Sequence, residues 1–420
     1  MAPSATITPL PPFQPDLYTR AWSSTPHPTL PLIATAHEKS VTVFSLSTLS
    51  KHSSLTGGHA RSVRSAAWQP STSKGSPANR LRLVTASFDS TAGLWSYDES
   101  SSSSSTLEKE IKAAALSSDN EDEQEQEWEF NLVLEGHENE VKSLSFSPSG
   151  QYLATCSRDK TVWIWEDVGA EEDEYEWETV AVLSEHDGDV KCVAFAPHIE
   201  GRKQYAKMQS QDCLASASYD DTVRIWREDA ADGGEWVCVS VLEGHGGTVW
   251  GLQWEGKPRE KGKFPRLLTN SADATLRVWT LKEEEEDDDE EDTTTQQGGF
   301  KTGFGAIPNS MRRSLREEWE CTAVLPKVHT REVYSAAWSA ETGIVASTGS
   351  DGKIVLYQED EDTKEWKVIA TVEAAHGPYE INHITWCKRF DASAEKKGEE
   401  EMLVTTGDDG VVRPWEVRIA

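Results

Sequence analysis

Short apolar segments alternate with polar turns along the chain, and their spacing is typical of strands. Val, Ile and Thr recur in short runs, as in Leu153 to Ser157 and Val162 to Trp165. No long stretch has apolar residues at helical spacing. The 17 Trp residues, against four Met, favour strands that pack aromatic side chains against one another. The pattern predicts an all-β fold.

A repeated unit runs through these strands. Each copy has a Gly-His or similar dipeptide, an apolar strand, a turn Asp, and an aromatic residue six positions after that Asp. The dipeptides are Gly58-His59, Gly136-His137, Glu185-His186, Gly244-His245, Val328-His329 and Ala375-His376. The Asp and aromatic pairs are Asp89 and Trp95, Asp159 and Trp165, Asp220 and Trp226, Asp273 and Trp279, Asp351 and Tyr357, and Asp409 and Trp415. A degenerate seventh copy opens the chain, where Glu38 stands six residues before Phe44 without a matching Gly-His.

The repeat predicts a polar network inside each four-stranded blade. The loop His, a strand Ser or Thr, the turn Asp and the strand Trp can hydrogen-bond in series, which fixes strand register. The predicted network residues are His59, His137, His186, His245, His329, His376, Asp89, Asp159, Asp220, Asp273, Asp351 and Asp409. Seven copies predict a seven-bladed WD-repeat β-propeller that forms one domain over residues 1–420.

We expect the amino terminus to close the ring. Only Glu416 to Ala420 follow Trp415, too few residues for an outermost strand. Thr6 to Leu10 can supply that strand to the last blade, which removes the unpaired edges of an open ring.

The long insertions fall on one face. In a propeller, the loops from strand d to a and from b to c open on the top face, and the others open below. The acidic low-complexity insertions 98–127 and 281–318 join strands c and d, and 197–212 and 388–401 join strands a and b. We therefore expect all four on the bottom face. The acidic runs have the composition of solvated spacers, and a regulatory role for them stays open.

The net charge of −31 lies mostly in such runs. Asp119 to Glu129, Glu166 to Glu178 and Glu283 to Asp292 hold seven, eight and ten acidic residues without a Lys or Arg. The rest of the chain is mildly acidic, which argues weakly against nucleic acid as a partner. No apolar run is long enough to cross a membrane and no signal peptide is evident, so we expect an intracellular protein. The six Cys residues contain no C-x-x-C, which predicts reduced core thiols and no metal site or cofactor.

Two sets of positions are expected to point upward from the top face. One directly precedes the turn acid and the other lies just inside the first strand, where we place Tyr18 in the first repeat. The partner-binding candidates among them are Arg158, Lys142, Arg64, Lys191, Tyr219, Phe88, Trp250 and Tyr334. Basic groups beside exposed aromatics are typical of an anchor for an acidic or carboxylate-bearing peptide. The alternative is that Glu140 and Asp189 neutralise the two lysines and leave an ordinary mixed surface.

The third repeat carries a family resemblance. Leu134-Glu135-Gly136-His137-Glu138-Asn139-Glu140-Val141-Lys142-Ser143, continued by Leu153 to Glu166, closely resembles the WD-repeat family of cytosolic iron-sulfur protein assembly. The next repeat, with Leu183 to Lys191 and Ala217 to Arg224, resembles it as well. The distinguishing residues are concentrated between Leu134 and Trp226, although generic repeats cover nearly the whole chain.

The resemblance implies a non-catalytic adaptor of the cytosolic targeting complex, which delivers iron-sulfur clusters to apoproteins in the cytosol and nucleus. The implied partners are a small α/β subunit, a HEAT-repeat adaptor, a hydrogenase-like iron-sulfur carrier and iron-sulfur apoprotein clients. The family's top-face Arg in the third blade matches Arg158.

Other functions stay open at this point. An enzyme would need a nucleophile, a base and oxyanion donors at one mouth, and no catalytic motif suggests them. Binding of a cluster by this chain would need about four thiolates brought together. A ubiquitin-ligase substrate receptor would carry Asp-x-Arg after the strand-ending Trp, where this chain has Ser96, Glu166, Arg227 and Thr280. A chromatin-tail reader remains an alternative, although basic groups around Arg158 favour a ligand of the opposite charge.

Overall fold

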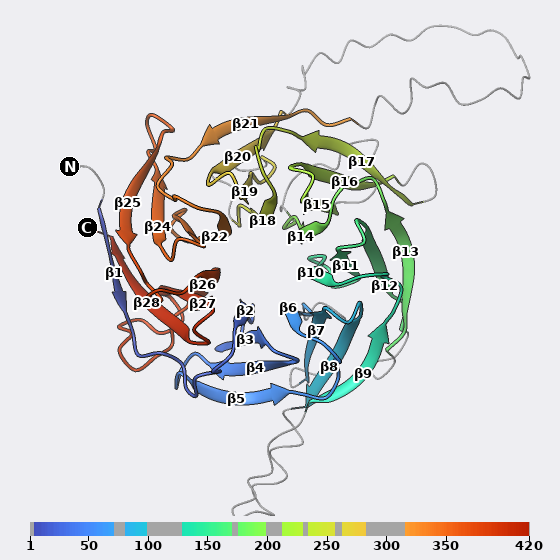
Figure 1. Cartoon of the computed structure of the whole chain (residues 1–420), viewed down its shortest axis with the longest axis horizontal. Helices are drawn as coiled ribbons and strands as arrows, with labels where there is room; N and C mark the ends of the chain where they lie inside the picture. The colour runs from blue at the N-terminus through green and yellow to red at the C-terminus, as the bar shows by residue number, and fades with distance from the viewer. Residues whose placement is uncertain are drawn as a thin grey trace, which may run out of the picture.

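The computed structural model describes residues 4–70, 80–98, 128–169, 175–198, 212–229, 234–256, 263–282 and 316–419. These residues form seven four-stranded antiparallel sheets, arranged as the blades of a ring (Figure 1). The prediction of an all-β, seven-bladed propeller is confirmed. The described residues include no helix that could span a membrane.

Each blade runs from an inner strand to an outer strand. Blade one has β2 (Ala21–Pro26), β3 (Leu32–His37), β4 (Ser40–Ser45) and β5 (Ser50–Leu55). Blade two has β6 (Val63–Trp68), β7 (Arg80–Ser87), β8 (Ala92–Asp98) and β9 (Glu129–Leu134). Blade three has β10 (Val141–Phe146), β11 (Tyr152–Ser157), β12 (Val162–Asp167) and β13 (Trp177–Leu183). Blade four has β14 (Val190–Phe195), β15 (Cys213–Ser218), β16 (Val223–Asp229) and β17 (Glu235–Leu242).

The remaining blades follow the same order. Blade five has β18 (Val249–Trp254), β19 (Leu267–Ser271), β20 (Leu276–Leu281) and β21 (Trp319–Val324). Blade six has β22 (Val333–Trp338), β23 (Val345–Gly349), β24 (Ile354–Glu359) and β25 (Trp366–Val372). Blade seven has β26 (Ile381–Lys388), β27 (Glu401–Gly407), β28 (Val412–Ile419) and β1 (Ala5–Pro9).

The ring closes through its amino-terminal strand. β1 pairs antiparallel with β28, from Ala5 opposite Ile419 to Pro9 opposite Trp415. It is the outermost strand of blade seven, where Figure 1 shows the two ends of the chain close together. The prediction that residues 6–10 supply this strand is confirmed, with a shift of one residue.

The core lies between the blades. Seven apolar clusters each combine buried side chains of two neighbouring blades. One example joins Phe44 of blade one to Val404 of blade seven. Each blade therefore buries its faces only against its neighbours, which is why a closed ring stabilises all of them.

The insertions fall between the strands that the sequence indicates. β8 and β9 flank insertion 98–127, and β20 and β21 flank insertion 281–318, so both are connections from strand c to d. Residues 99–127 and 283–315 lie outside the described residues, as do 199–211 of the connection between β14 and β15. Residues 389–400, between β26 and β27, are described.

Candidate functional site

The polar network of blade three shows how the repeat residues work together. His137 Nδ1 lies 2.8 Å from Asp159 Oδ2, and His137 Nε2 lies 2.9 Å from Thr155 Oγ1. Trp165 Nε1 donates to the same hydroxyl at 3.0 Å. A side chain at Gly136 would collide with the ring of Trp163, which explains why a glycine precedes the histidine. The network ties the top loop to the second and third strands of the blade.

The same arrangement recurs in five other blades. The His Nδ1 to Asp distances are 3.1 Å for His59 and Asp89, 2.8 Å for His186 and Asp220, 3.0 Å for His245 and Asp273, 3.0 Å for His329 and Asp351, and 2.9 Å for His376 and Asp409. In each blade, His Nε2 also contacts a buried Ser or Thr hydroxyl. Both ring nitrogens are thus engaged inside the blade.

These contacts change the acidity of the turn aspartates. Burial alone would raise the pKa of Asp159, but hydrogen bonds from His137 and Thr161 outweigh it and lower the pKa to about 2. The same balance holds the pKa of the other five turn aspartates below its ordinary value. All six are therefore firmly ionised near neutral pH.

A β-bulge shapes the top of every inner strand. In each blade, the pairing with the second strand skips one residue, which is left unpaired. The skipped residues are Trp22, Arg64, Lys142, Lys191, Trp250, Tyr334 and Asn382. A bulge re-aims the side chain of its extra residue, so these seven form a ring around the mouth of the central channel.

The bulges correct one sequence expectation. Tyr18 was expected to hold the inner-strand position of blade one, but it precedes β2, has a φ of 57° and is 84% exposed. Trp22 holds that position instead. Its ring contacts two cations, with the ring centre 4.8 Å from the guanidinium of Arg20 and 4.6 Å from that of Arg64. The sequence did not indicate Trp22, because the first repeat is degenerate and has no Gly-His to mark the start of its inner strand.

The structure separates the eight partner-binding candidates into two groups. Arg64, Lys142, Lys191, Trp250 and Tyr334 line a hollow of about 260 Å³ in the channel. Phe88, Arg158 and Tyr219 lie outside it, in turns between the second and third strands. The groups touch, because Lys142 Nζ lies 4.2 Å from the centre of the Phe88 ring and Lys191 Nζ lies 5.5 Å from that of Tyr219.

Two carboxylates lie among the basic side chains of blades two to four, which we call the basic arc. Glu140 contacts Lys142 at 2.5 Å and Arg61 at 3.2 Å, and Asp189 contacts Lys191 at 3.1 Å. Arg158 bridges these two acids, at 3.9 Å from Glu140 and 3.8 Å from Asp189. The local neutralisation considered for the lysines is therefore present in the geometry. Arg158 keeps 55% of its side chain exposed beside these acids.

The opposite arc of the mouth has a different chemistry. Trp250 Nε1 donates to Glu332 at 3.0 Å, and the Tyr334 hydroxyl donates to Glu380 at 3.3 Å. Each bond crosses from one blade to the next. Burial, together with Glu380 and Glu332, raises the pKa of Tyr334 to about 12. The mouth therefore has a basic side at blades two to four and an acidic side at blades six and seven.

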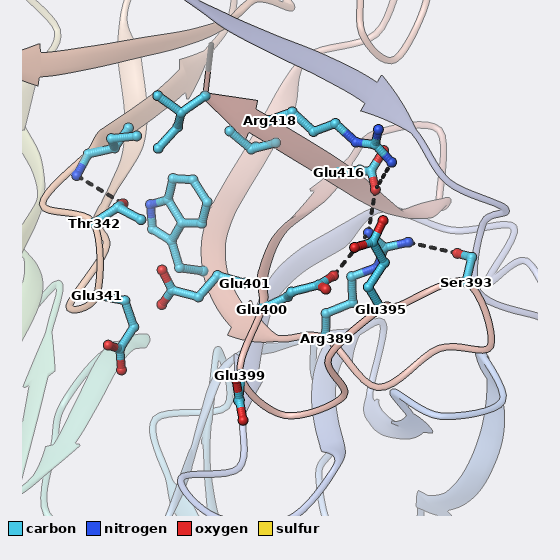
Figure 2. Close-up of a pocket in the computed structure, with 14 residues that line it drawn as sticks. Glu341, Thr342, Arg389, Ser393, Glu395, Glu399, Glu400, Glu401, Glu416 and Arg418 are labelled. Carbon is cyan, nitrogen blue, oxygen red and sulfur yellow. Dashed lines mark hydrogen bonds and ion pairs between the residues drawn. The ribbon is translucent and has the colours of Figure 1, made fainter.

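A second hollow, of about 510 Å³, lies beside blades six and seven, near the end of β28 (Figure 2). Arg389 crosses it and contacts Asp391 at 2.6 Å, Glu416 at 2.5 Å and Ser393 at 2.7 Å. These contacts fasten the loop after β26 to β28. The sequence placed this loop but did not single out Arg389, since no repeat position marks it.

The described part of the chain contains no cluster of metal-binding side chains. No group of three or more His, Cys, Asp or Glu residues there is placed to hold a metal ion. The six cysteines are free thiols, and Cys156, Cys213 and Cys387 are buried. Burial raises the pKa of Cys387 and Cys156, which keeps these thiols protonated.

Comparisons with known proteins agree with this architecture. The family model for the WD domain, G-beta repeat, matches residues 45–96, 128–166, 177–227, 236–280 and 319–358. The chain is 63% identical to a probable cytosolic iron-sulfur protein assembly protein 1 of Neurospora crassa, over 100% of this chain and 97% of the relative. The protein of the same name from Chaetomium globosum is 61% identical, over 99% and 96% of the two chains. That of Pyricularia oryzae is 60% identical, over 97% and 95%.

Proposed function

Since the chain belongs to the WD-repeat family of cytosolic iron-sulfur protein assembly protein 1, we propose that it is a non-catalytic scaffold of that assembly process. The histidines of the repeat support a structural role. Both nitrogens of each repeat histidine are engaged within its own blade, so none is placed to act as a general base. A cytosolic location agrees with the names of the relatives, and we extend it to the nucleus because cluster-containing clients are found there.

The scaffold would serve the targeting complex that hands clusters to apoproteins. We assign its partners as a small α/β subunit, a HEAT-repeat adaptor, a hydrogenase-like carrier and the apoprotein clients, following the sequence resemblance of blades three and four. A ring of rigid blades with top loops of repeated form suits a protein that holds several others at once.

The observation that carries the docking proposal is the position of Arg158. Its side chain is 55% exposed, and its guanidinium lies within 4 Å of two carboxylates, those of Glu140 and Asp189. Neither distance is that of a close hydrogen bond, so the guanidinium can rotate toward an incoming carboxylate. Phe88 and Tyr219 stand on the neighbouring blades, and Tyr219 is 62% exposed. Phe88 is half-buried. Arg beside an exposed aromatic ring is typical of a binding hot spot for an acidic peptide.

Binding of a client peptide tests this surface. The complex of this chain with its small partner would be titrated with a client-type carboxy-terminal peptide, comparing wild type with Arg158→Glu. Reversal of a charge that pairs with the peptide is expected to weaken binding by about 2 kcal/mol or more, with an unchanged melting temperature.

A matched control is available on the same face. Arg331 follows His329 in blade six as Arg61 follows His59 in blade two, and it is exposed. Arg331→Glu makes the same charge change outside the basic arc and should leave peptide affinity at the wild-type value. Equal affinity of both variants would move the docking site away from blade three.

A further inference from the structure

Among the residues that the structure describes, Arg64 is a cation without a carboxylate partner. Its Nη1 donates to the carbonyl oxygen of Trp22 at 3.2 Å, and its guanidinium lies over the Trp22 ring. Every other contact recorded for it within the described residues is with neutral or basic groups. A guanidinium held inside a protein normally has a carboxylate or several acceptors, because its removal from water is costly.

The surroundings of Arg64 add positive charge. Lys142 and Lys191 line the same hollow, from the next two blades, and no Asp or Glu of the described ranges lines it. Glu140 and Asp189 contact the two ammonium groups but are not part of the wall. The remaining wall offers small polar groups, including Ser23, Ser65 and Asn270. The hollow therefore gathers three cations and several hydrogen-bond donors about one space.

The positive charges of the hollow repel one another, and burial removes them from water. Burial, with a smaller contribution from nearby Arg20, lowers the pKa of Arg64 to about 10. Burial also lowers the pKa of Lys142 despite its contact with Glu140, and Lys191 and Arg64 contribute to the decrease. His383, on the wall, has a pKa of about 4 through burial and the field of Arg64, so it is neutral near pH 7. A bound anion would relieve this repulsion.

We propose that the hollow at the channel mouth is a binding site for a small multivalent oxyanion of the size of phosphate, held by Arg64, Lys142 and Lys191. Arg64 supplies the fork that pairs with two oxygens, and the two lysines supply single charges. A volume of about 260 Å³ accommodates such an anion with several waters. The site is distinct from docking at Arg158, which does not line the hollow, and can be tested without any partner protein.

Titration with inorganic phosphate on the full chain tests the site. Calorimetry and thermal melting would be measured at constant ionic strength, with chloride as the replaced anion. Wild type is expected to bind phosphate in a saturable way and to melt at higher temperature as the site fills. Arg64→Gln is expected to weaken binding at least about tenfold, since it removes the bidentate group.

Arg331→Gln is the matched control, because it removes one arginine from the same face but outside the hollow. It should bind phosphate as wild type does. No saturable binding by wild type, or equal binding by the Arg64 and Arg331 variants, would overturn the proposal. Lys191→Gln is a second variant in case Arg64→Gln does not fold, and its affinity for phosphate should also fall.

The origin of the oxyanion can be resolved in the same assay. A capped peptide with one phosphoserine would compete with phosphate in wild type, measured against the same peptide with serine. Tighter binding of the phosphopeptide than of phosphate assigns the hollow to a phosphorylated side chain. Weaker binding assigns it to a free anion, and both results keep the oxyanion site.

Discussion

Blade three and blade one hold the same four-stranded form by different means. Blade three fixes its top loop with His137, Asp159 and Thr155. The loop before the inner strand of blade one, residues 10–20, contains no histidine in the sequence, and the turn after its second strand carries Glu38, which is exposed. The ring of Phe44 packs 5.3 Å from that of Phe13, in an apolar cluster shared with blade seven. Apolar packing against the closing segment thus substitutes for the polar network where the repeat is degenerate.

Removal of the closing strand β1 should cause the largest loss of stability. Deletion of residues 1–10 removes β1, exposes the edge of β28 and loosens the blade against which Phe44 packs. We expect a loss of stability of about 5 kcal/mol or more, since five paired residues are lost. Thermal melting checks it, and deletion of residues 2–4, which leaves β1 whole, should melt as wild type. An unchanged melting temperature for the longer deletion would contradict closure by β1.

The apolar substitute of blade one can be tested by truncation. Phe44 is fully buried. Phe44→Ala is expected to destabilise the protein by about 3 to 5 kcal/mol through lost burial and a residual cavity. Urea unfolding would measure it. A cost below about 1 kcal/mol would show that the cluster does not hold blade one.

The polar device of blade three can be tested against its counterpart in blade one. Asp159→Asn removes the charge that accepts from His137 and Thr161, and should cost about 2 to 3 kcal/mol. Glu38→Gln is the matched control at the exposed turn of blade one, where the adjacent His37 contacts Thr42 through Nε2, and it should change stability by less than about 0.5 kcal/mol. Similar costs for both variants would remove the distinction between the two blades.

The smallest effect is a dependence on pH. The pKa of Asp159 is about 2 in the fold, against an ordinary 3.8. Its stabilisation is fully present above about pH 4 and is lost as pH falls toward 2, because the unfolded chain takes up the proton first. One such aspartate contributes on the order of 2 kcal/mol. Acid unfolding should thus be shallower for Asp159→Asn than for wild type, whereas Glu38→Gln should follow wild type.

The repeat allowed much of the fold to be predicted. An Asp six residues before an aromatic marks the turn between the second and third strands, because that interval spans the turn and most of one short strand. The pattern therefore located Asp159 and Trp165 together, and the spare residues 6–10 indicated closure. The sequences of blades three and four indicated the family.

The channel mouth could be predicted only in part. Lys142 and Trp250 were predicted to lie just inside the first strand of their repeats, but in the degenerate first repeat the same position was given to Tyr18, where the structure has Trp22. Bonds such as that from Trp250 to Glu332 join neighbouring blades, so they depend on ring closure rather than on spacing within a repeat. Nor does a sequence reveal that Arg64 has no acidic partner in the part of the chain that the structure describes, since this depends on which carboxylates reach the hollow.

The pairing of Ala5 with Ile419 also sets a schedule for folding in the cell. A ribosome adds about 5 to 20 residues per second, so the first strand waits tens of seconds for its neighbour to be made. Blades one to six each consist of contiguous sequence and can form as they emerge, but blade seven cannot. The nascent chain therefore passes through an open arc with two free blade faces, and this is the interval in which it most needs protection from aggregation.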